Sequence, residues 1–452
     1  MLIIPLLMLA AQGSPAPPPP HVASPSRVVS FALDHPCPLQ DAKFGQGLAH
    51  LDMDGDGFQD LAVGAPGEGK AYVFFGRANS TARRPFRAVY RTFSPVGPRA
   101  CGDPSNASYL GQDMVGGQLD TDTNDELVVG APGTSIGGLR WSGSVCIYGA
   151  RGIGSTPVTL VSPIVEAGRF GESVTIGDFD GDGQMDLAVS APKSLVSGVE
   201  SGRVFVYPGG PIYPTGPVIE IPNPNPVSHG NFGQHLAVAD TNFDGIDDLV
   251  ISAVGNTNAA GGRVAGQVFV FPGPLQPTQF LVIEDPNPIP SDLPAPRFGM
   301  HIDARDHFVA IGAPRKDHGG LHDPGMGFVQ AGPSFPITTM HVNPNLLPSD
   351  YMGFRCLIGD FISDDALDFG FLTLRSRELL IWDGANLNNL TVPDVIITSK
   401  PGSADHWGNG SLVARLVPGA REQVILGDPS FDNPGISPAN NDAGRVVLYF
   451  LP

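Results

Sequence analysis

Three landmarks define a unit that recurs along the chain. In its first copy they are the pair Phe44-Gly45, an Asp-rich loop that reads DMDGDGFQD, and Gly64-Ala65-Pro66 at the end of a short apolar run. A repeat of this length is one supersecondary unit that buries its apolar face only against neighbouring copies. The aromatic or apolar residue before glycine recurs roughly 60 residues apart, at Leu110-Gly111, Phe170-Gly171, Phe232-Gly233, Phe298-Gly299, Met352-Gly353 and Trp407-Gly408.

Each unit consists of short apolar or alternating runs bounded by Gly, Asp and Pro, a pattern that indicates strands. The first unit contains LAHL, DLAVGAP and KAYVFFG, and a more variable fourth run follows in each unit, such as VTLVSP in the second. Four antiparallel strands repeated around a ring are typical of a β-propeller. We therefore predict an all-β fold: a seven-bladed β-propeller of four-stranded antiparallel blades over residues 27–452.

The two ends of the chain predict how the ring closes. After Trp407 the last unit supplies only three strands, and one spare strand, Val28–Leu33, precedes the first unit. Placing this N-terminal strand as the outer strand of the last blade completes that blade and covers an exposed edge. The alternatives are an open β-solenoid or tandem sandwiches, but the repeat is long for a solenoid coil and short for a sandwich domain.

The Asp-rich loop has the pattern of a metal site. Acidic residues at positions 1, 3, 5 and 9 repel one another unless a cation lies among them, and an all-oxygen, flexible cage suits Ca²⁺. The residue at position 7 offers its backbone carbonyl. Three units keep a side-chain oxygen at all four positions, the fourth unit with the neutral Asn242 at position 3, so we predict about three Ca²⁺ sites, in blades 1, 3 and 4. The predicted ligands are Asp52, Asp54, Asp56, Phe58 and Asp60 in the first unit, Asp178, Asp180, Asp182, Gln184 and Asp186 in the third, and Asp240, Asn242, Asp244, Ile246 and Asp248 in the fourth.

The other four units depart from this pattern. The second reads DTDTNDE from Asp120 to Glu126, which we interpret as two residues short, and the sixth has Ile362 at position 3 between Asp360 and Asp368. Metal in these two units is left open. The fifth and seventh are expected to have lost the loop. The competing interpretation is that Asp and Gly only form hairpin turns; repetition at one place in the unit favours a cation that stabilises the hairpin.

The aromatic-Gly start, the DxDxDGxxD loop and the Gly-Ala-Pro end together resemble FG-GAP repeats, as in the head of integrin α-subunits and their bacterial relatives. The resemblance covers roughly residues 28–452. It implies a seven-bladed propeller with Ca²⁺ in the hairpin loops and an extracellular interaction role. Partnership of the integrin kind with a β-subunit is not expected, because no leg domains, transmembrane helix or cytoplasmic tail are recognised.

Composition narrows the partners and the compartment. The net charge of −19 disfavours nucleic acid, and no apolar run is long enough to span a bilayer. The run MLIIPLLMLAAQG predicts a signal peptide over residues 1–13, and residues 14–26 read as a Pro-rich linker. We therefore expect a secreted or cell-surface protein. Secretion permits disulfides, and of the four cysteines we prefer Cys101 with Cys146, four buried thiols being the alternative.

Function is expected on the face opposite the Asp-rich loops, where loops of variable length join the second and third strands. The range 77–91 is a separate feature, since it places five arginines around Phe86 and Tyr90 and suits an acidic polysaccharide or protein, a solvated outer strand being the alternative. The His and Asp residues around the fifth unit match no zinc pattern. We predict a non-catalytic binding or adhesion module for extracellular protein or glycan. The alternative is a propeller enzyme, a lyase or hydrolase of extracellular polysaccharide that uses His and Arg at the central funnel.

Overall fold

The computed structural model describes residues 28–36, 41–87, 90–93, 108–149, 156–210, 218–257, 265–286, 288, 297–332, 339–345, 347–362, 366–386, 392–399, 408–431 and 444–451. The predicted signal peptide and linker, Cys37, Cys101 and Trp407 lie outside these ranges. No helix in the described part of the chain is long and apolar enough to cross a membrane.

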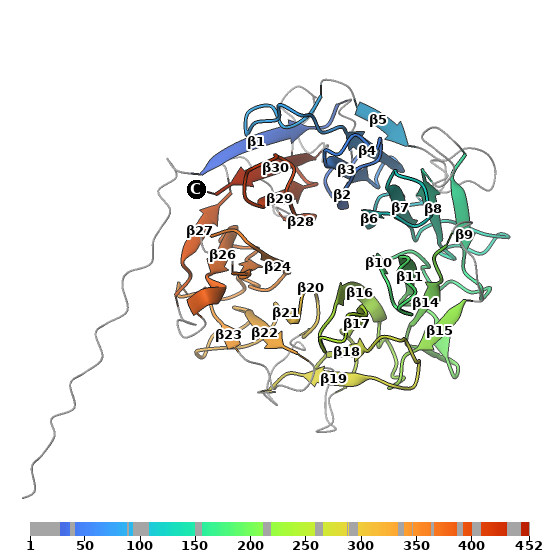
Figure 1. The fold of residues 1–452 in the computed structure, drawn as a ribbon. Helices are drawn as coiled ribbons and strands as arrows, with labels where there is room; N and C mark the ends of the chain where they lie inside the picture. The colour runs from blue at the N-terminus through green and yellow to red at the C-terminus, as the bar shows by residue number, and fades with distance from the viewer. Residues whose placement is uncertain are drawn as a thin grey trace, which may run out of the picture.

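The described strands form seven antiparallel sheets of four strands, arranged as blades around a ring (Figure 1). The predicted seven-bladed propeller is confirmed. Blade 1 contains β2 (Leu48–Leu51), β3 (Asp60–Ala65), β4 (Lys70–Phe74) and β5 (Tyr90–Phe93); blade 2 contains β6 (Met114–Gly117), β7 (Glu126–Ala131), β8 (Ser144–Tyr148) and β9 (Val158–Val161). Blade 3 contains β10 (Val174–Gly177), β11 (Asp186–Ala191), β14 (Arg203–Tyr207) and β15 (Ile219–Pro222), with a hairpin of β12 (Leu195–Val196) and β13 (Val199–Glu200) between β11 and β14.

The remaining blades follow the same order. Blade 4 contains β16 (Phe232–Ala239), β17 (Asp248–Ala253), β18 (Gln267–Phe271) and β19 (Leu281–Glu284); blade 5 contains β20 (Ile302–Arg305), β21 (Phe308–Ala313), β22 (Met326–Ala331) and β23 (Thr339–His341). Blade 6 contains β24 (Arg355–Gly359), β25 (Asp368–Leu372), β26 (Glu378–Trp382) and β27 (Val395–Thr398), with a short 3₁₀ turn, η1 (Gly384–Asn386), before β27. Blade 7 contains β28 (Ser411–Ala414), β29 (Gln423–Asp428), β30 (Arg445–Phe450) and β1 (Val29–Asp34).

The ring closes as predicted, through the N-terminal strand. β1 pairs antiparallel with β30, from Val29 opposite Phe450 to Asp34 opposite Arg445. The first strand of every blade contacts the first strand of the next, and β2 also contacts β28, so these inner strands form an unbroken circle. Pairing the two ends of the chain in one sheet leaves the last blade without an unpaired edge at β30.

The backbone explains why the aromatic-glycine and Gly-Ala-Pro landmarks occur together. The N–H of Gly45 donates a 2.9 Å hydrogen bond to the carbonyl of Gly64 in the same blade. The next blade then approaches closely, because a Cβ on Gly64 would lie 2.1 Å from the carbonyl oxygen of Gly111. Across the closure, a Cβ on Gly427 would lie 1.8 Å from the carbonyl oxygen of Gly45. Glycine is therefore required at these positions by contact between blades.

The hydrophobic core is divided into seven clusters, one between each pair of adjacent blades. The aromatic residue before glycine anchors several of them. Phe44 and Phe170 are fully buried, and each packs against an aromatic side chain of the third strand of its blade: Phe44 on Tyr72 at 5.7 Å and Phe170 on Phe205 at 5.8 Å between ring centroids. Burial of aromatic pairs between blades holds the ring together.

Candidate metal sites and the central channel

The Asp loop joins the first two strands of a blade, and in blade 1 it runs from Asp52 (position 1) to Asp60 (position 9). Asp52 accepts hydrogen bonds from the backbone N–H groups of Asp56 at 3.0 Å and Gly57 at 2.8 Å, so the loop wraps around its carboxylate. Gly57 has a φ of 82° and no atom within 4 Å of a Cβ, so glycine serves here for its conformation alone. Asp178 and Asp240 wrap the loops of blades 3 and 4 in the same way.

The position-9 carboxylate fastens the loop to the rest of the blade. Asp60 is fully buried and accepts the N–H of Met53 at 3.0 Å and the N–H of Gly76, beyond β4, at 2.8 Å. Asp186, Asp248 and Asp368 make the equivalent bonds in blades 3, 4 and 6. This residue therefore has a structural role in addition to the ligand role predicted for it.

Burial shifts the pKa of these carboxyl groups. Burial, together with the nearby carboxylates of Asp54 and Asp52, raises the pKa of Asp60 to about 7. Burial likewise raises the pKa of Asp186 to about 6. A bound divalent cation supplies the positive charge that the ionised forms need.

In each of three loops, the acidic side chains place oxygen atoms close to one another. In blade 1, oxygens of Asp52, Asp54 and Asp60 lie within 4.8 Å of one another, and in blade 3 the same holds for Asp178, Asp180 and Asp186. One carboxylate oxygen of Asp54 is buried without a hydrogen-bond partner. Carboxylate oxygens grouped in this way suit Ca²⁺. Blade 4 has the same hydrogen bonds from the loop backbone, and at position 3 the neutral side-chain oxygen of Asn242 accepts the N–H of Asp244 at 2.9 Å. The N–H groups of Phe58, Gln184 and Ile246 bond the position-5 carboxylate, and the ligand role of their carbonyls stays a prediction.

The interpretation of the blade 2 loop as two residues short is wrong. Gly117 pairs with Glu126 in blade 2 as Leu51 pairs with Asp60 in blade 1, so the two loops have the same length. Position 1 is Gln118 and position 9 is Glu126, because Glu126 accepts the N–H of Leu119 as Asp60 accepts that of Met53. Asp120, Asp122 and Glu126 form the third group of converging acids. Gln118 and Glu126 each bury one side-chain oxygen that has no partner, so this loop also fits a cation.

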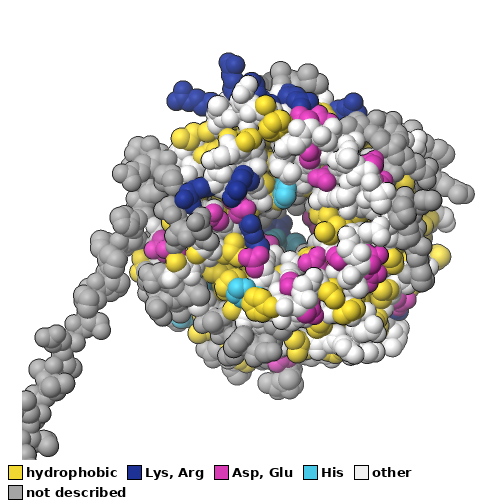
Figure 2. Space-filling view, viewed as in Figure 1, with side chains coloured by type: hydrophobic (Ala, Val, Ile, Leu, Met, Phe, Trp, Pro, Cys, Tyr) yellow, Lys and Arg dark blue, Asp and Glu magenta, His cyan; other side chains and the backbone are white. Residues whose placement is uncertain are grey.

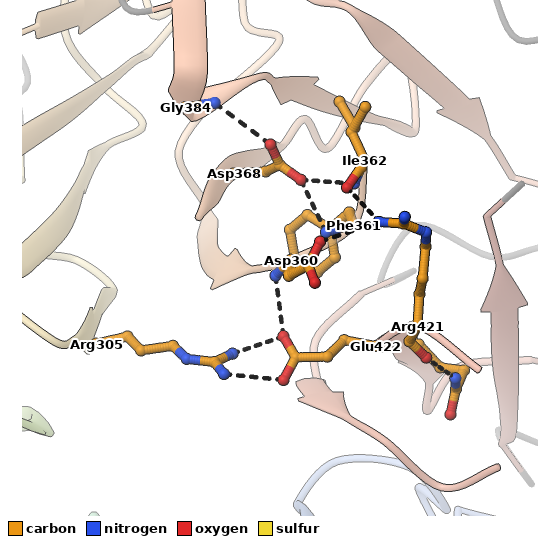
Figure 3. A network of polar contacts seen from close by, with 9 residues as sticks. Arg305, Asp360, Phe361, Ile362, Asp368, Gly384, Arg421 and Glu422 are labelled. Carbon is orange, nitrogen blue, oxygen red and sulfur yellow. Dashed lines mark hydrogen bonds and ion pairs between the residues drawn. The ribbon is translucent and has the colours of Figure 1, made fainter. Parts of the chain in front are cut away.

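In blade 6 an arginine lies where the other loops offer room for an ion (Figure 3). Arg421, from blade 7, donates to the position-1 carboxylate of Asp360 at 3.2 Å and to the carbonyl of Ile362, at position 3, at 2.6 Å. Asp364, which the sequence places at position 5 of this loop, lies outside the described residues. In blade 5, Arg305 pairs directly with Phe308, so the loop is lost as expected. For blade 7 the expectation of a lost loop is wrong as to length: Ala414 pairs with Gln423 as Leu51 pairs with Asp60, and only the acids at the ligand positions are missing. Gln423 at position 9 accepts the N–H of Leu416.

Blade 1 contains an arginine that sequence reasoning did not connect with the loop. The guanidinium of Arg87 donates to Asp54 at 2.8 Å and also bonds Asp56. These carboxylates are two of the predicted calcium ligands. Arg87 and a bound ion would therefore compete for them, a relationship hidden in the sequence because Arg87 lies in the connection between β4 and β5.

The central channel opens at the end of the ring opposite the Asp loops, where the inner strands begin. The mouth has a volume of about 260 Å³. Each blade contributes to it the side chain that directly follows the glycine of its Phe44-Gly45-type pair. The seven are Gln46, Gln112, Glu172, Gln234, Met300, Phe354 and Asn409. The mouth is therefore rich in amides. Figure 2 shows the hollow at the centre of the ring, seen from one face.

Arginine, histidine and aspartate side chains also line this channel. Arg355 donates to Nε2 of His235 at 3.3 Å, and its own Nε is buried without a partner. His301 lies beside His235, with 4.6 Å between ring centroids. Burial, with a smaller contribution from Arg355, lowers the pKa of His235 to about 3, so this ring is neutral at physiological pH. Asp113, held by Ser173 at 2.8 Å, supplies a carboxyl group whose pKa burial raises.

The histidines around the fifth unit do not form one cluster in the structure. His301 lies in the channel, whereas His322 pairs with Asp317 at 3.2 Å in the loop between β21 and β22.

Cys146 takes part in a disulfide and Cys356 is a buried free thiol, so four buried thiols are excluded; the preferred partner Cys101 lies outside the described residues. The loops 133–142 and 315–325 join second to third strands, on the face opposite the Asp loops, as expected.

Fold and repeat together define the class: a seven-bladed propeller that contains FG-GAP repeats. The FG-GAP repeat model matches residues 44–80 and 170–207, which lie in blades 1 and 3. Integrin alpha-5 of Xenopus laevis is 29% identical over 232 residues, covering 48% of this chain and 20% of the relative. Phosphatidylinositol-glycan-specific phospholipase D of Rattus norvegicus is 33% identical over 213 residues, covering 42% of this chain and 24% of the relative.

These relatives differ in kind, since integrins and a phospholipase both match, and the chain spans a quarter or less of either. Among solved structures, virginiamycin B lyase from Staphylococcus aureus has a TM-score of 0.53 at 9% identity, covering 94% of this chain and 100% of that chain. At this identity the likeness concerns the fold alone.

Proposed function

We propose that the chain is a secreted, calcium-stabilised propeller that acts as a non-catalytic binding module for extracellular protein or glycan. The observation that carries this proposal is the channel mouth, where seven side chains, one from each blade, converge on one opening. Amide side chains both donate and accept hydrogen bonds, so such a ring suits recognition of a polar group. Arg355 below it, with an unpartnered Nε, adds a donor for a carboxylate.

Calcium has a structural role in this proposal. The loops of blades 1, 3 and 4 hold ions as the sequence predicts, and the corrected blade 2 loop holds a fourth through Gln118, Asp120, Asp122 and Glu126. When bound, the ion supplies positive charge to carboxylates that are otherwise buried together, and it stabilises the folded ring through binding linkage. Secretion is supported by the apolar N-terminal run and by the disulfide of Cys146, since disulfides persist in oxidising compartments.

The second candidate is an enzyme acting on extracellular polysaccharide, which the channel's His235, His301 and Arg355 favour. A neutral histidine is a possible general base, and an arginine can hold an acidic sugar. Two contacts weigh against it: Nε2 of His235 faces Arg355, and Nδ1 of His301 accepts the N–H of Cys356 at 3.2 Å. Both lone pairs are therefore occupied.

A glycan and matrix-protein array, run with and without EDTA, separates the two candidates. Retention that EDTA abolishes, with no product released, supports a calcium-stabilised binding module. Release of new reducing sugar ends supports the enzyme and contradicts the proposal. The variant Arg355→Gln should weaken retention of a ligand held at the mouth, whereas Arg140→Gln, an exposed arginine on the hairpin of blade 2, should not.

A further inference from the structure

Exposed arginines gather on the rim of the ring where it closes. Arg83 and Arg84 are exposed and Arg77 is half-buried, and Figure 2 shows the cluster of Lys and Arg side chains over β1 and β5 at the top of the view. Among the described residues none of the three has an acidic partner. On a chain with a net charge of −19, three unpaired guanidinium groups at one place form a local positive surface.

These arginines surround an apolar pocket of about 390 Å³, which we call the seam pocket. Its walls come from two blades: Phe31 and Leu33 belong to β1 of blade 7, and Phe74 and Tyr90 belong to β4 and β5 of blade 1. Phe86, in the connection between β4 and β5, completes the lining. The pocket therefore lies on the seam between the N-terminal strand and the first blade.

The pocket is held in shape by contacts within blade 1. Phe74 packs on Tyr90 at 5.6 Å and on Phe86 at 6.0 Å between ring centroids. The arginine-bearing hairpin is fixed by the N–H of Arg84, which donates to the carbonyl of Thr81 at 2.8 Å. The N–H of Arg87 donates to the carbonyl of Phe75 at 2.8 Å and ties the hairpin back to β4. A pocket shaped in advance loses little entropy when it is filled.

We propose that the seam pocket binds an acidic protein segment that inserts one apolar side chain between flanking carboxylates. The aromatic floor suits an apolar side chain, and the arginine rim suits carboxylates on either side of it. Charge complementarity selects this occupant, since the rim is positive while the chain as a whole is acidic.

A peptide fits these features better than an acidic polysaccharide. Four of the five side chains that form the floor are hydrocarbon: Phe31, Leu33, Phe74 and Phe86. A sugar ring would bring hydroxyl groups into this floor and lose their hydrogen bonds to water without replacement. An aliphatic or aromatic side chain loses none.

This site is separate from the channel mouth and rests on the proposed function only in taking the chain to be a binding protein. The probes are labelled peptides measured by fluorescence anisotropy with the purified full chain: Glu-Glu-Phe-Glu-Glu, and two controls that replace either the phenylalanine by serine or all four glutamates by glutamine. Heparin serves as the polysaccharide probe. We expect the first peptide to bind more tightly than both controls, and its binding to weaken with added salt.

Two variants test the two halves of the pocket. The double variant Arg83→Gln/Arg84→Gln should weaken binding by about tenfold, because it removes two exposed guanidinium groups that pair with the carboxylates of the peptide. The variant Leu33→Trp fills the floor and should abolish the preference for phenylalanine over serine. Arg140→Gln, which removes an exposed arginine elsewhere, should bind as the unaltered chain does.

Equal binding of the three peptides would overturn the proposal, as would a double variant that binds normally. Heparin binding that the double variant loses, with no peptide binding, would instead assign the site to a polysaccharide. If the peptides fail while a ligand found on the array is still retained, the seam pocket is refuted and the proposed function stands.

Discussion

The guanidinium of Arg305 and the carboxylate of Glu422 form two hydrogen bonds, of 2.6 and 2.9 Å (Figure 3). Arg305 ends the inner strand of blade 5, and Glu422 precedes β29 of blade 7. Glu422 also accepts the N–H of Asp360, in blade 6, at 2.9 Å. One carboxylate therefore connects three consecutive blades. Asp125 and Asp247 occupy the same position in blades 2 and 4, where they accept the N–H of Asp52 at 2.7 Å and of Asp178 at 2.9 Å.

Glu422→Ala should lower the free energy of unfolding by about 1–3 kcal/mol, because it leaves the N–H of Asp360 and the guanidinium of Arg305 without their acceptor. Arg305→Ala should cost less, about 1 kcal/mol or below, since Arg305 is 39% exposed and water can replace it. Chemical denaturation measures both. Glu422→Gln, which keeps one acceptor oxygen, should fall between them, and equal losses for the two alanine variants would contradict this account.

Arg87→Gln should tighten calcium binding in blade 1. The guanidinium that bonds Asp54 and Asp56 must give up these carboxylates when an ion arrives, so its removal lowers the calcium concentration needed for stabilisation by several-fold. Melting curves in chelator-buffered calcium report this midpoint. Arg84→Gln is the matched control, because Arg84 lies in the same connection but makes no bond to the loop. A midpoint that stays unchanged or rises in Arg87→Gln would refute competition.

Substitutions in the blade 3 loop and in the blade 6 loop should respond differently to EDTA. Asp180→Asn removes a predicted ligand in blade 3, so it should reduce the loss of Tm that EDTA causes in the unaltered chain. A filled site contributes about 2.7 kcal/mol when calcium is 100 times its Kd. Asp360→Asn in blade 6, where Arg421 bonds the position-1 carboxylate, should shift Tm equally with and without EDTA. An EDTA-dependent shift for Asp360→Asn would show that blade 6 also holds calcium.

Stability should fall in mild acid partly through His341. Burial lowers the pKa of this ring to about 3, whereas in the unfolded chain it is about 6.5. Between these values the unfolded state binds more protons, so the contribution is complete above about pH 6.5 and is lost as the pH falls toward 3. His341→Phe keeps the packing on Phe371 and Trp382 and should flatten the dependence of unfolding free energy on pH. His318→Gln, at an exposed position, should not. A slope unchanged by His341→Phe would contradict this assignment.

The ring could be predicted from the sequence because its defining contacts fall on residues that repeat. Gly45 and its counterparts are fixed by backbone contact within and between blades, so the residue pair that ends in this glycine recurs in every copy. The counterpart of Gly64 varies more, since it is Ser190 in blade 3 and Ser252 in blade 4. The length of the blade 2 loop could not be predicted in this way, because Gln118 and Glu126 stand where blade 1 has aspartates at the two ends of the loop. Only the strand register reveals that the two loops have the same length.

The ion-pair partners could not be predicted. Arg87, Arg421 and Glu422 act on loops of other strands or other blades, and which loop each one reaches depends on the curvature of the ring. The channel mouth is a partial exception. The residue after the repeat's glycine occupies one equivalent position in every blade, so its convergence could have been found once the propeller was assumed.

The central claim is that calcium stabilises the Asp loops of some blades and that protein side chains stabilise those of others. Anomalous diffraction from crystals grown in millimolar calcium tests this claim most directly. We predict anomalous density in the loops that follow β2, β6, β10 and β16, and none in the loop between Asp360 and Asp368, where Arg421 lies. Absence of density among Asp52, Asp54 and Asp60 and among Asp178, Asp180 and Asp186 would contradict the account.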